Sequence, residues 1–157
     1  MHIYLLRHEK ARERALGFPD AERELTPEGL ANAMKKAKKL KKKLKNLSLI
    51  LASPYPRAWQ TAEIYARTLG ILDRLKSEST LSAGSDARQI LKHLAENFAL
   101  SSQQKIMLVG HESWLSELAS LFICGNTHAH LCLKKGGVMK LVIDKLTPQG
   151  GHLVWLR

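Results

Sequence analysis

Aromatic residues, cysteines and long apolar runs are scarce in this sequence of 157 residues. Only 6% of the residues are aromatic, and the two cysteines are Cys124 and Cys132. These cysteines lack the CxxC spacing of metal and redox sites, so we expect two reduced, buried thiols. No apolar run approaches the roughly 20 residues that a membrane-spanning helix needs, and no secretory signal is recognisable. We therefore expect a soluble, cytoplasmic protein.

Acidic residues are also few, with 14 Asp and Glu against 25 Lys and Arg and a net charge of +11. This balance favours an anionic partner, such as a phosphorylated substrate, an acidic protein or nucleic acid. Much of the excess comes from lysines between residues 35 and 43, on a predicted helix with one apolar stripe. We interpret these lysines as a solvated helix face, or alternatively as a docking face for an acidic protein. No interleaved aromatic residue or nucleic-acid-binding motif points to nucleic acid.

Apolar segments alternate with amphipathic ones along most of the chain, and hydrophobic residues make up 45% of it. This pattern predicts an α/β protein, a three-layer αβα sandwich with a mostly parallel central sheet, formed as a single domain over residues 1–157. The expected strands are 1–6, 48–52, 105–109, 138–143 and 152–156, with one possible short strand within 71–84. The expected helices are 27–45, 56–69, 86–98 and 114–122.

Three of the predicted strands are followed at once by cationic or imidazole side chains. Arg7 and His8 follow the first strand, Arg57 follows the second within a Pro-rich turn, and His111 follows the third after Gly110. Open α/β sheets bind ligands at the carboxyl edge of their strands, so these side chains are expected to converge there. Gly110 would let the backbone approach a ligand closely. The polar loop 9–25 could cover the site.

Two arginines and two histidines at one sheet edge would form a strongly cationic pocket. Guanidinium groups match the paired oxygens of a phosphoryl group. One histidine could attack phosphorus while the other stabilises its oxygens as charge shifts. Core packing explains the three groups poorly, because buried cations without partners cost several kcal/mol.

The same residues resemble a known family. Leu6-Arg7-His8 after the first strand, Ser-Pro-x-x-Arg-Ala-x-Gln-Thr-Ala over residues 53–62, and Gly110-His111 are similar to the histidine phosphatase superfamily, also called phosphoglycerate mutase-like. The chain's small size and the early Leu-Thr-Pro-Glu-Gly at 25–29 most resemble SixA-type phosphohistidine phosphatases. The resemblance covers residues 1 to about 143. It implies that His8 is a nucleophile that is transiently phosphorylated, that Arg7, Arg57 and His111 bind the phosphoryl group, and that no metal or other cofactor takes part.

Two positions depart from the pattern of that family. Glu9 stands where a small residue is usual, so we expect its carboxylate to point away from the phosphate pocket or to pair with a cation such as Lys10. Glu112 is the only positional match to the general acid of larger members, and we regard it as a candidate proton donor. Its alternative role is to stabilise the N-terminus of the following helix.

The sequence favours a phosphatase that acts on a phosphorylated substrate, with a phosphohistidine protein as the leading candidate, because little insertion is available to build a deep lid. The same chemistry on sugar phosphates or nucleotides is one alternative, and a non-catalytic basic binding module on the same scaffold is another. The missing lid insertion argues against mutase activity. His128 and His130 could face one side of a strand, but without a third ligand we expect no metal site there.

Overall fold

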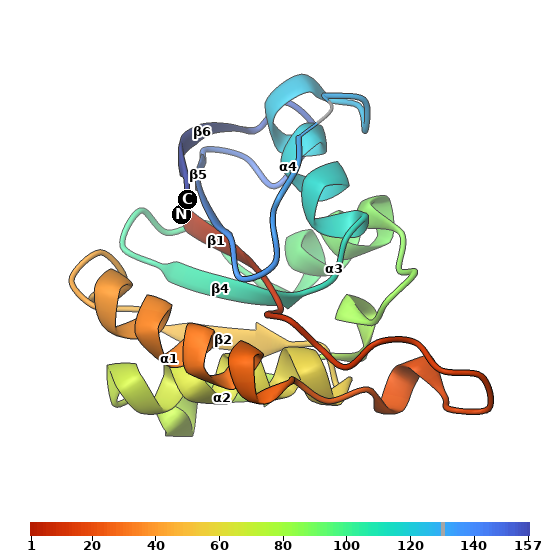
Figure 1. The fold of residues 1–157 in the computed structure, drawn as a ribbon. Coiled ribbons are helices and arrows are strands. Elements are labelled where there is room, and N and C mark those ends of the chain that lie inside the picture. The colour runs from red at the N-terminus through yellow and green to blue at the C-terminus, as the bar shows by residue number, and fades with distance from the viewer. Residues whose placement is uncertain (130) are drawn as a thin grey trace.

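The computed structural model describes residues 1–129 and 131–157, and its centre is a six-stranded sheet in the order β3-β2-β4-β1-β5-β6 (Figure 1). The first four of these strands are parallel, and β5 and β6 run antiparallel to their neighbours. The strands are β1 (His2–Arg7), β2 (Leu49–Ala52), β3 (Leu75–Ser77), β4 (Lys105–Gly110), β5 (Val138–Ile143) and β6 (Gly151–Leu156). The helices are α1 (Pro27–Leu40), α2 (Pro56–Leu69), α3 (Ala87–Asn97) and α4 (Trp114–Cys124). The predicted α/β class and the three layers are confirmed.

Strand β1 contributes to both faces of the sheet. Ile3 and Leu5 belong to the apolar cluster that includes α3 and α4, whereas Tyr4 and Leu6 belong to the cluster that includes α1 and α2. Successive side chains of a strand point to opposite faces, so a strand covered by helices on both sides must be apolar throughout. The uninterrupted run Ile3-Tyr4-Leu5-Leu6 satisfies this requirement.

Helix α1 begins as predicted but ends earlier. The Thr26 hydroxyl accepts a hydrogen bond from the Gly29 N–H at 3.0 Å, and Pro27 occupies the first helical position. The regular helix ends at Leu40 rather than near Lys45, and residues 41–46 form turns. The expectation of a helix to Lys45 was therefore wrong. Leu44 and Leu47 are both buried, and Asn46 has a φ of +66°, so the chain reverses direction within these turns before β2.

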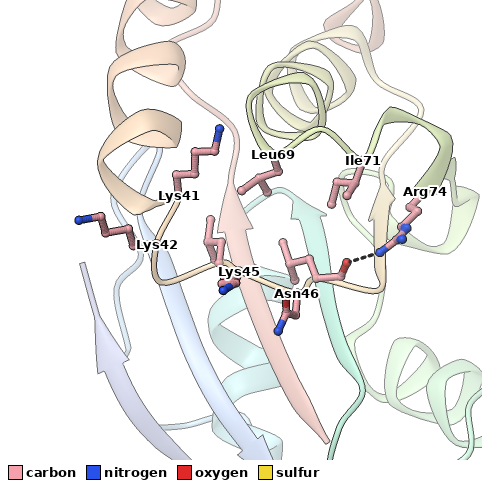
Figure 2. Close-up of a pocket in the computed structure, with 9 residues that line it drawn as sticks. Lys41, Lys42, Lys45, Asn46, Leu69, Ile71 and Arg74 are labelled. Atoms are coloured by element: carbon pink, nitrogen blue, oxygen red, sulfur yellow. Dashed lines mark hydrogen bonds between the residues drawn. The ribbon is translucent and has the colours of Figure 1, made fainter.

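The lysines of these turns surround a cavity of about 530 Å³ (Figure 2). Its apolar lining comes from Leu44, Leu47, Leu69 and Ile71, and its polar lining comes from Lys41, Lys42, Lys45, Asn46 and Arg74. The Arg74 guanidinium donates a hydrogen bond to the Leu47 carbonyl at 3.1 Å. Residues 41–47 precede β2 and residues 69–74 precede β3, so this cavity lies at the amino edge of the sheet. It is therefore at the opposite edge from the predicted phosphate pocket.

The two cysteines differ from their prediction. Both are free, but both are exposed rather than buried. Cys124 is the last residue of α4, and Cys132 lies in the segment that follows this helix. Among the described residues, no helix combines the length and the hydropathy required to cross a bilayer.

Truncating the core of β1 tests this packing. Leu5 is fully buried between the strands and the α3–α4 layer. We expect Leu5→Ala to lower the free energy of unfolding by about 2–5 kcal/mol, because it removes buried methyl groups and leaves a cavity. Leu153→Ala on the exposed side of β6 is the matched control and should change it by less than about 0.5 kcal/mol. Urea denaturation measures both, and equal effects would contradict the assignment.

Candidate active site

The parallel strands bring the predicted residues to one place. Strand β4 lies between β2 and β1, the His8 N–H donates to the Gly110 carbonyl at 3.0 Å, and the Ser53 N–H donates to the Val109 carbonyl at 2.9 Å. A cavity of about 180 Å³ lies at this edge. All five predicted site residues line it, together with residues of loop 9–25 and two others: Arg7, His8, Arg57, His111, Glu112, Ala11, Arg14, Asp20, Arg23, Ala83 and Lys135.

The ring of His8 is held in one tautomer. Its Nδ1 lies 2.7 Å from the carbonyl oxygen of Glu9, and a carbonyl oxygen can only accept a hydrogen bond. Nδ1 therefore carries the proton, and Nε2 of the neutral ring keeps its lone pair. Burial lowers the pKa of His8 to about 4, aided by the charges of Arg57 and Arg7 and opposed by the bond to Glu9. The ring is consequently neutral near pH 7.

His111 is oriented by Ser53. The His111 Nε2 lies 2.8 Å from the Ser53 hydroxyl oxygen, which also accepts a hydrogen bond from the Tyr55 N–H at 3.3 Å. The hydroxyl can either accept a hydrogen bond from Nε2 or give its own hydrogen to Nε2, and in the second arrangement the proton of His111 lies on Nδ1. Burial lowers the pKa of His111 to about 3, with smaller contributions from His8 and Arg57. The two imidazole rings lie 5.2 Å apart between their centroids.

Gly110 has a different role from the one expected from the sequence. A Cβ atom at this position would lie 2.1 Å from a ring carbon of Trp114. The glycine therefore makes room for the buried indole rather than for a ligand. This packing holds the first turn of α4 against the end of β4, immediately beside His111.

Both arginines are held by protein groups and keep one buried donor free. Arg7 donates to the Leu133 carbonyl at 2.7 Å, and Arg57 donates to the carbonyl and the carboxylate of Asp20 at 2.6 and 2.9 Å. The Nε atoms of both arginines, and Nδ1 of His111, are buried and have no hydrogen-bond partner among the residues that the structure describes. A phosphoryl group offers several acceptor oxygens, which these three donors could satisfy together.

Asp20 is a residue of the site that sequence reasoning missed. Its carboxylate contacts the guanidinium groups of Arg14, Arg23 and Arg57 at 2.8–2.9 Å. Burial by itself would raise the pKa of Asp20, but the hydrogen bonds from Arg23 and Arg14 and the charge of Arg57 lower it to about 2. Its position in a loop directly after Arg7 and His8 was the available signal, since that loop was expected to cover the site.

The two glutamates next to the histidines have separate environments. Glu9 is buried and does not line the pocket, and its carboxylate pairs with Lys36 at 2.7 Å, whereas Lys10 pairs with Glu28. The Glu112 carboxylate accepts hydrogen bonds from the Ser116 hydroxyl at 2.8 Å and from the Leu133 N–H at 3.1 Å. These bonds hold the carboxylate against the first turn of α4, which supports the helix-stabilising role.

Among the residues that the structure describes, no three His, Cys, Asp or Glu side chains are grouped so that they could hold a metal ion. His128 is one of these residues, and His130 lies outside them. The cationic side chains that line the pocket are those of Arg7, Arg14, Arg23, Arg57 and Lys135.

The site is thus a cationic pocket with an oriented, neutral imidazole ring at the carboxyl edge of a parallel sheet, in an α/β protein. The profile of the Histidine phosphatase superfamily (branch 1) matches residues 3–82, and the chain belongs to this family. An uncharacterized protein of Picosynechococcus sp. (strain ATCC 27264 / PCC 7002 / PR-6) is 35% identical over 146 residues, which are 90% of this chain and 84% of the relative.

Solved structures share the fold over almost the whole chain. The protein histidine phosphatase SixA complexed with tungstate has a TM-score of 0.82 at 22% identity, covering 99% of this chain and 96% of that one. A putative phosphohistidine phosphatase SixA from Agrobacterium tumefaciens has a TM-score of 0.79 at 24% identity, with the same two coverages. A mycobacterial glucosyl-3-phosphoglycerate phosphatase complexed with VO3 has a TM-score of 0.72 at 16% identity, and each chain is covered to 98%.

The lowered pKa values of the two histidines predict how stability depends on pH. In the folded protein the pKa is about 4 for His8 and about 3 for His111, whereas the ordinary pKa of histidine, which applies to the unfolded chain, is 6.5. Between these values the unfolded state binds more protons, so the free energy of unfolding should fall as the pH falls from about 6.5 to about 4. Urea denaturation at a series of pH values measures this slope.

Single substitutions test whether the buried histidines of the site cause this pH dependence of the free energy of unfolding. His111→Asn should make the dependence shallower than in the wild type, because one neutral buried imidazole is removed. His152→Asn, on the exposed side of β6, is the control and should leave the slope almost unchanged. An unchanged slope in His111→Asn would contradict the burial of a neutral ring at that position.

Proposed function

We propose that the protein is a metal-independent phosphatase that forms a covalent phosphohistidine intermediate on His8, and that its substrate is a protein phosphohistidine. The observation that carries this proposal is the His8 ring, whose Nδ1 hydrogen is bonded to the Glu9 carbonyl so that Nε2 has a free lone pair. Family membership and the fold shared with SixA structures support the phosphatase assignment.

The first step transfers the phosphoryl group to His8. The lone pair of His8 Nε2 forms a bond to phosphorus while the bond from phosphorus to the leaving group breaks. Arg7, Arg57 and His111 donate hydrogen bonds to the phosphoryl oxygens as negative charge shifts among them. The guanidinium groups supply positive charge beside the phosphoryl oxygens, which is the role that a metal ion has in other phosphoryl-transfer sites.

The second step releases phosphate. A water molecule attacks phosphorus, the bond from phosphorus to Nε2 breaks, and its electron pair returns to the imidazole of His8. Inorganic phosphate leaves with the proton given up by the water. A phosphohistidine substrate needs little help from a general acid in the first step, because its imidazole can depart already protonated.

Trapping of the phosphoenzyme tests the mechanism. Wild-type protein incubated with radiolabelled phosphoramidate and quenched rapidly should carry acid-labile label, and His8→Ala should carry none. His152→Ala, which removes an exposed histidine, should be labelled like the wild type. A folded wild type that takes up no label while it releases phosphate, or label that persists in His8→Ala, would overturn the assignment of His8.

Loop 9–25 favours a protein over a small molecule as the substrate. An antiparallel bridge between Ala11 and Leu25 closes the base of the loop, and Asp20 connects it to Arg57. At its tip, Leu16 is fully exposed and Phe18 is about half exposed. Because residues of the same loop line the pocket, a large molecule with its phosphoryl group in the pocket would pass beside these two apolar side chains. We therefore propose that the tip contacts the protein that carries the phosphohistidine.

Replacing the tip separates the two substrate classes. Leu16→Ser with Phe18→Ser should lower kcat/KM for a phosphohistidine protein about tenfold, since burial of two large apolar side chains is lost, and should leave turnover of phosphoramidate unchanged. Leu153→Ser with Val154→Ser removes two exposed apolar residues of β6 and is the control. Equal losses on both substrates, or no loss on the protein, would contradict contact at the tip.

The small-molecule alternative makes a different prediction on the same substrates. A fold neighbour acts on glucosyl-3-phosphoglycerate according to its name, so sugar phosphates belong in the panel. Faster turnover of a sugar phosphate or nucleotide than of phosphohistidine protein would favour this alternative. A non-catalytic binding module would release phosphate from none of them and would bind nucleic acid in a salt-dependent manner.

A further inference from the structure

Glu9 is a buried carboxylate that the proposed chemistry does not use. Its side chain is only 3% exposed, and its Oε1 lies 2.7 Å from the Lys36 ammonium of α1. The angles at Oε1 do not fit a hydrogen bond, so this contact is a close ion pair without a hydrogen bond. Burial, and to a lesser extent the charge of Glu9, raise the pKa of the Tyr65 hydroxyl of α2. A buried carboxylate is costly without a partner, and Lys36 supplies the cation that offsets this cost.

Residue 9 is held at three points, and one of them is the carbonyl that orients the nucleophile. Its N–H donates to the Thr61 hydroxyl at 3.2 Å, its carbonyl accepts from His8 Nδ1 at 2.7 Å, and its carboxylate is paired with Lys36. The Thr61 hydroxyl in turn donates to the Arg57 carbonyl at 2.7 Å. The position of the Glu9 peptide therefore depends on contacts with α1 and α2 as well as on β1.

The segment 135–136 completes this arrangement. The Lys36 ammonium donates to the Lys135 carbonyl at 3.0 Å, and the Gly136 N–H lies 3.1 Å from the carbonyl oxygens of both Arg7 and His8. A Cβ atom at Gly136 would lie 1.8 Å from Glu9 Oε1 and 2.4 Å from the Lys36 ammonium nitrogen. The absence of a side chain at Gly136 thus provides the space in which Glu9 and Lys36 meet.

We propose that the Glu9–Lys36 ion pair positions the nucleophile by fixing the Glu9 carbonyl that holds His8 Nδ1. Glu9 and Lys36 are positioning residues, and this inference rests on the proposed role of His8. It accounts for a carboxylate directly after the catalytic histidine, where repulsion of the substrate would otherwise be expected. The carboxylate is directed away from the pocket, and its charge is neutralised by a lysine that does not line the phosphate pocket.

The substitution Lys36→Met tests the proposal because it leaves the Glu9 carboxylate buried and unpaired. The side chain should then move towards water or take up a proton, and the Glu9 peptide should shift with it. We expect the rate of phosphoenzyme formation from phosphoramidate to fall on the order of 10–100-fold, as misplacement of a reacting group commonly causes. The imidazole nitrogen shifts of His8 in NMR spectra should change from a single Nδ1–H tautomer to a mixture.

The double variant Glu9→Gln with Lys36→Met distinguishes positioning from a general loss of stability. It removes both charges, so no unpaired carboxylate remains and the free energy of unfolding should recover, but the ion pair is still missing, so the rate and the tautomer mixture should stay as in Lys36→Met. Lys35→Met, the neighbouring exposed lysine of α1, is the matched control and should behave like the wild type.

Two results would overturn the inference. One is a Lys36→Met protein with the wild-type tautomer and rate. The other is a double variant that has the wild-type tautomer and rate although it lacks the ion pair. If Lys36→Met does not fold, Glu9→Gln alone is used, and a wild-type tautomer and rate in that variant count against the proposal. The NMR readout does not require turnover, so failure of the proposed phosphatase activity in the wild type would be recognised separately by the absence of label.

Discussion

The hydrogen bond from His8 Nδ1 to the carbonyl oxygen of Glu9 is the contact on which the site depends. A histidine attacks phosphorus only through a nitrogen with a free lone pair, and this bond determines which nitrogen that is. It also opposes the effects of burial and of three nearby arginines, which would otherwise lower the pKa of the ring still further. The contacts around Glu9, from α1, α2 and the segment before β5, can be understood as support for this one carbonyl group.

Charge in the pocket is arranged so that the cations are held before a substrate arrives. Arg57 is buried, and burial lowers its pKa. The carboxylate of Asp20 acts in the opposite direction and stabilises the positive charge of the Arg57 guanidinium. Arg7 is fixed by a backbone carbonyl instead. Donors that are already fixed need little reorganisation during phosphoryl transfer, which is the main source of electrostatic stabilisation in such sites. The cost is a cluster of like charges at one sheet edge, and Asp20 offsets part of it.

The sequence predicted the layers and the strand ends because these depend on short-range patterns. An apolar run followed by Arg7 and His8, and another followed by Ser53 and Arg57, specify both the strands and the edge to which they deliver side chains. Contacts between residues far apart in the chain could not be predicted in this way. Lys36 was one lysine among many on α1, and only the packing of that helix beside β1 and Gly136 gives it a partner. Asp20 was likewise one of several charged residues in a polar loop. The end of α1 and the exposure of the cysteines depended on where the chain turns, which local propensity specifies weakly.

Loop 9–25 also has a consequence for how the protein could acquire a new specificity. Its base is closed by the Ala11–Leu25 bridge, and Asp20 ties it to Arg57, whereas the tip at Leu16 and Phe18 has few contacts with the rest of the molecule. Lengthening a loop at an exposed tip adds a closure entropy that grows only slowly with length. Extra residues inserted between Leu16 and Phe18 could therefore build a lid over the pocket while the strand ends and the nucleophile stay in place. A change of substrate at this site would then require an insertion at one position rather than a redesign of the sheet.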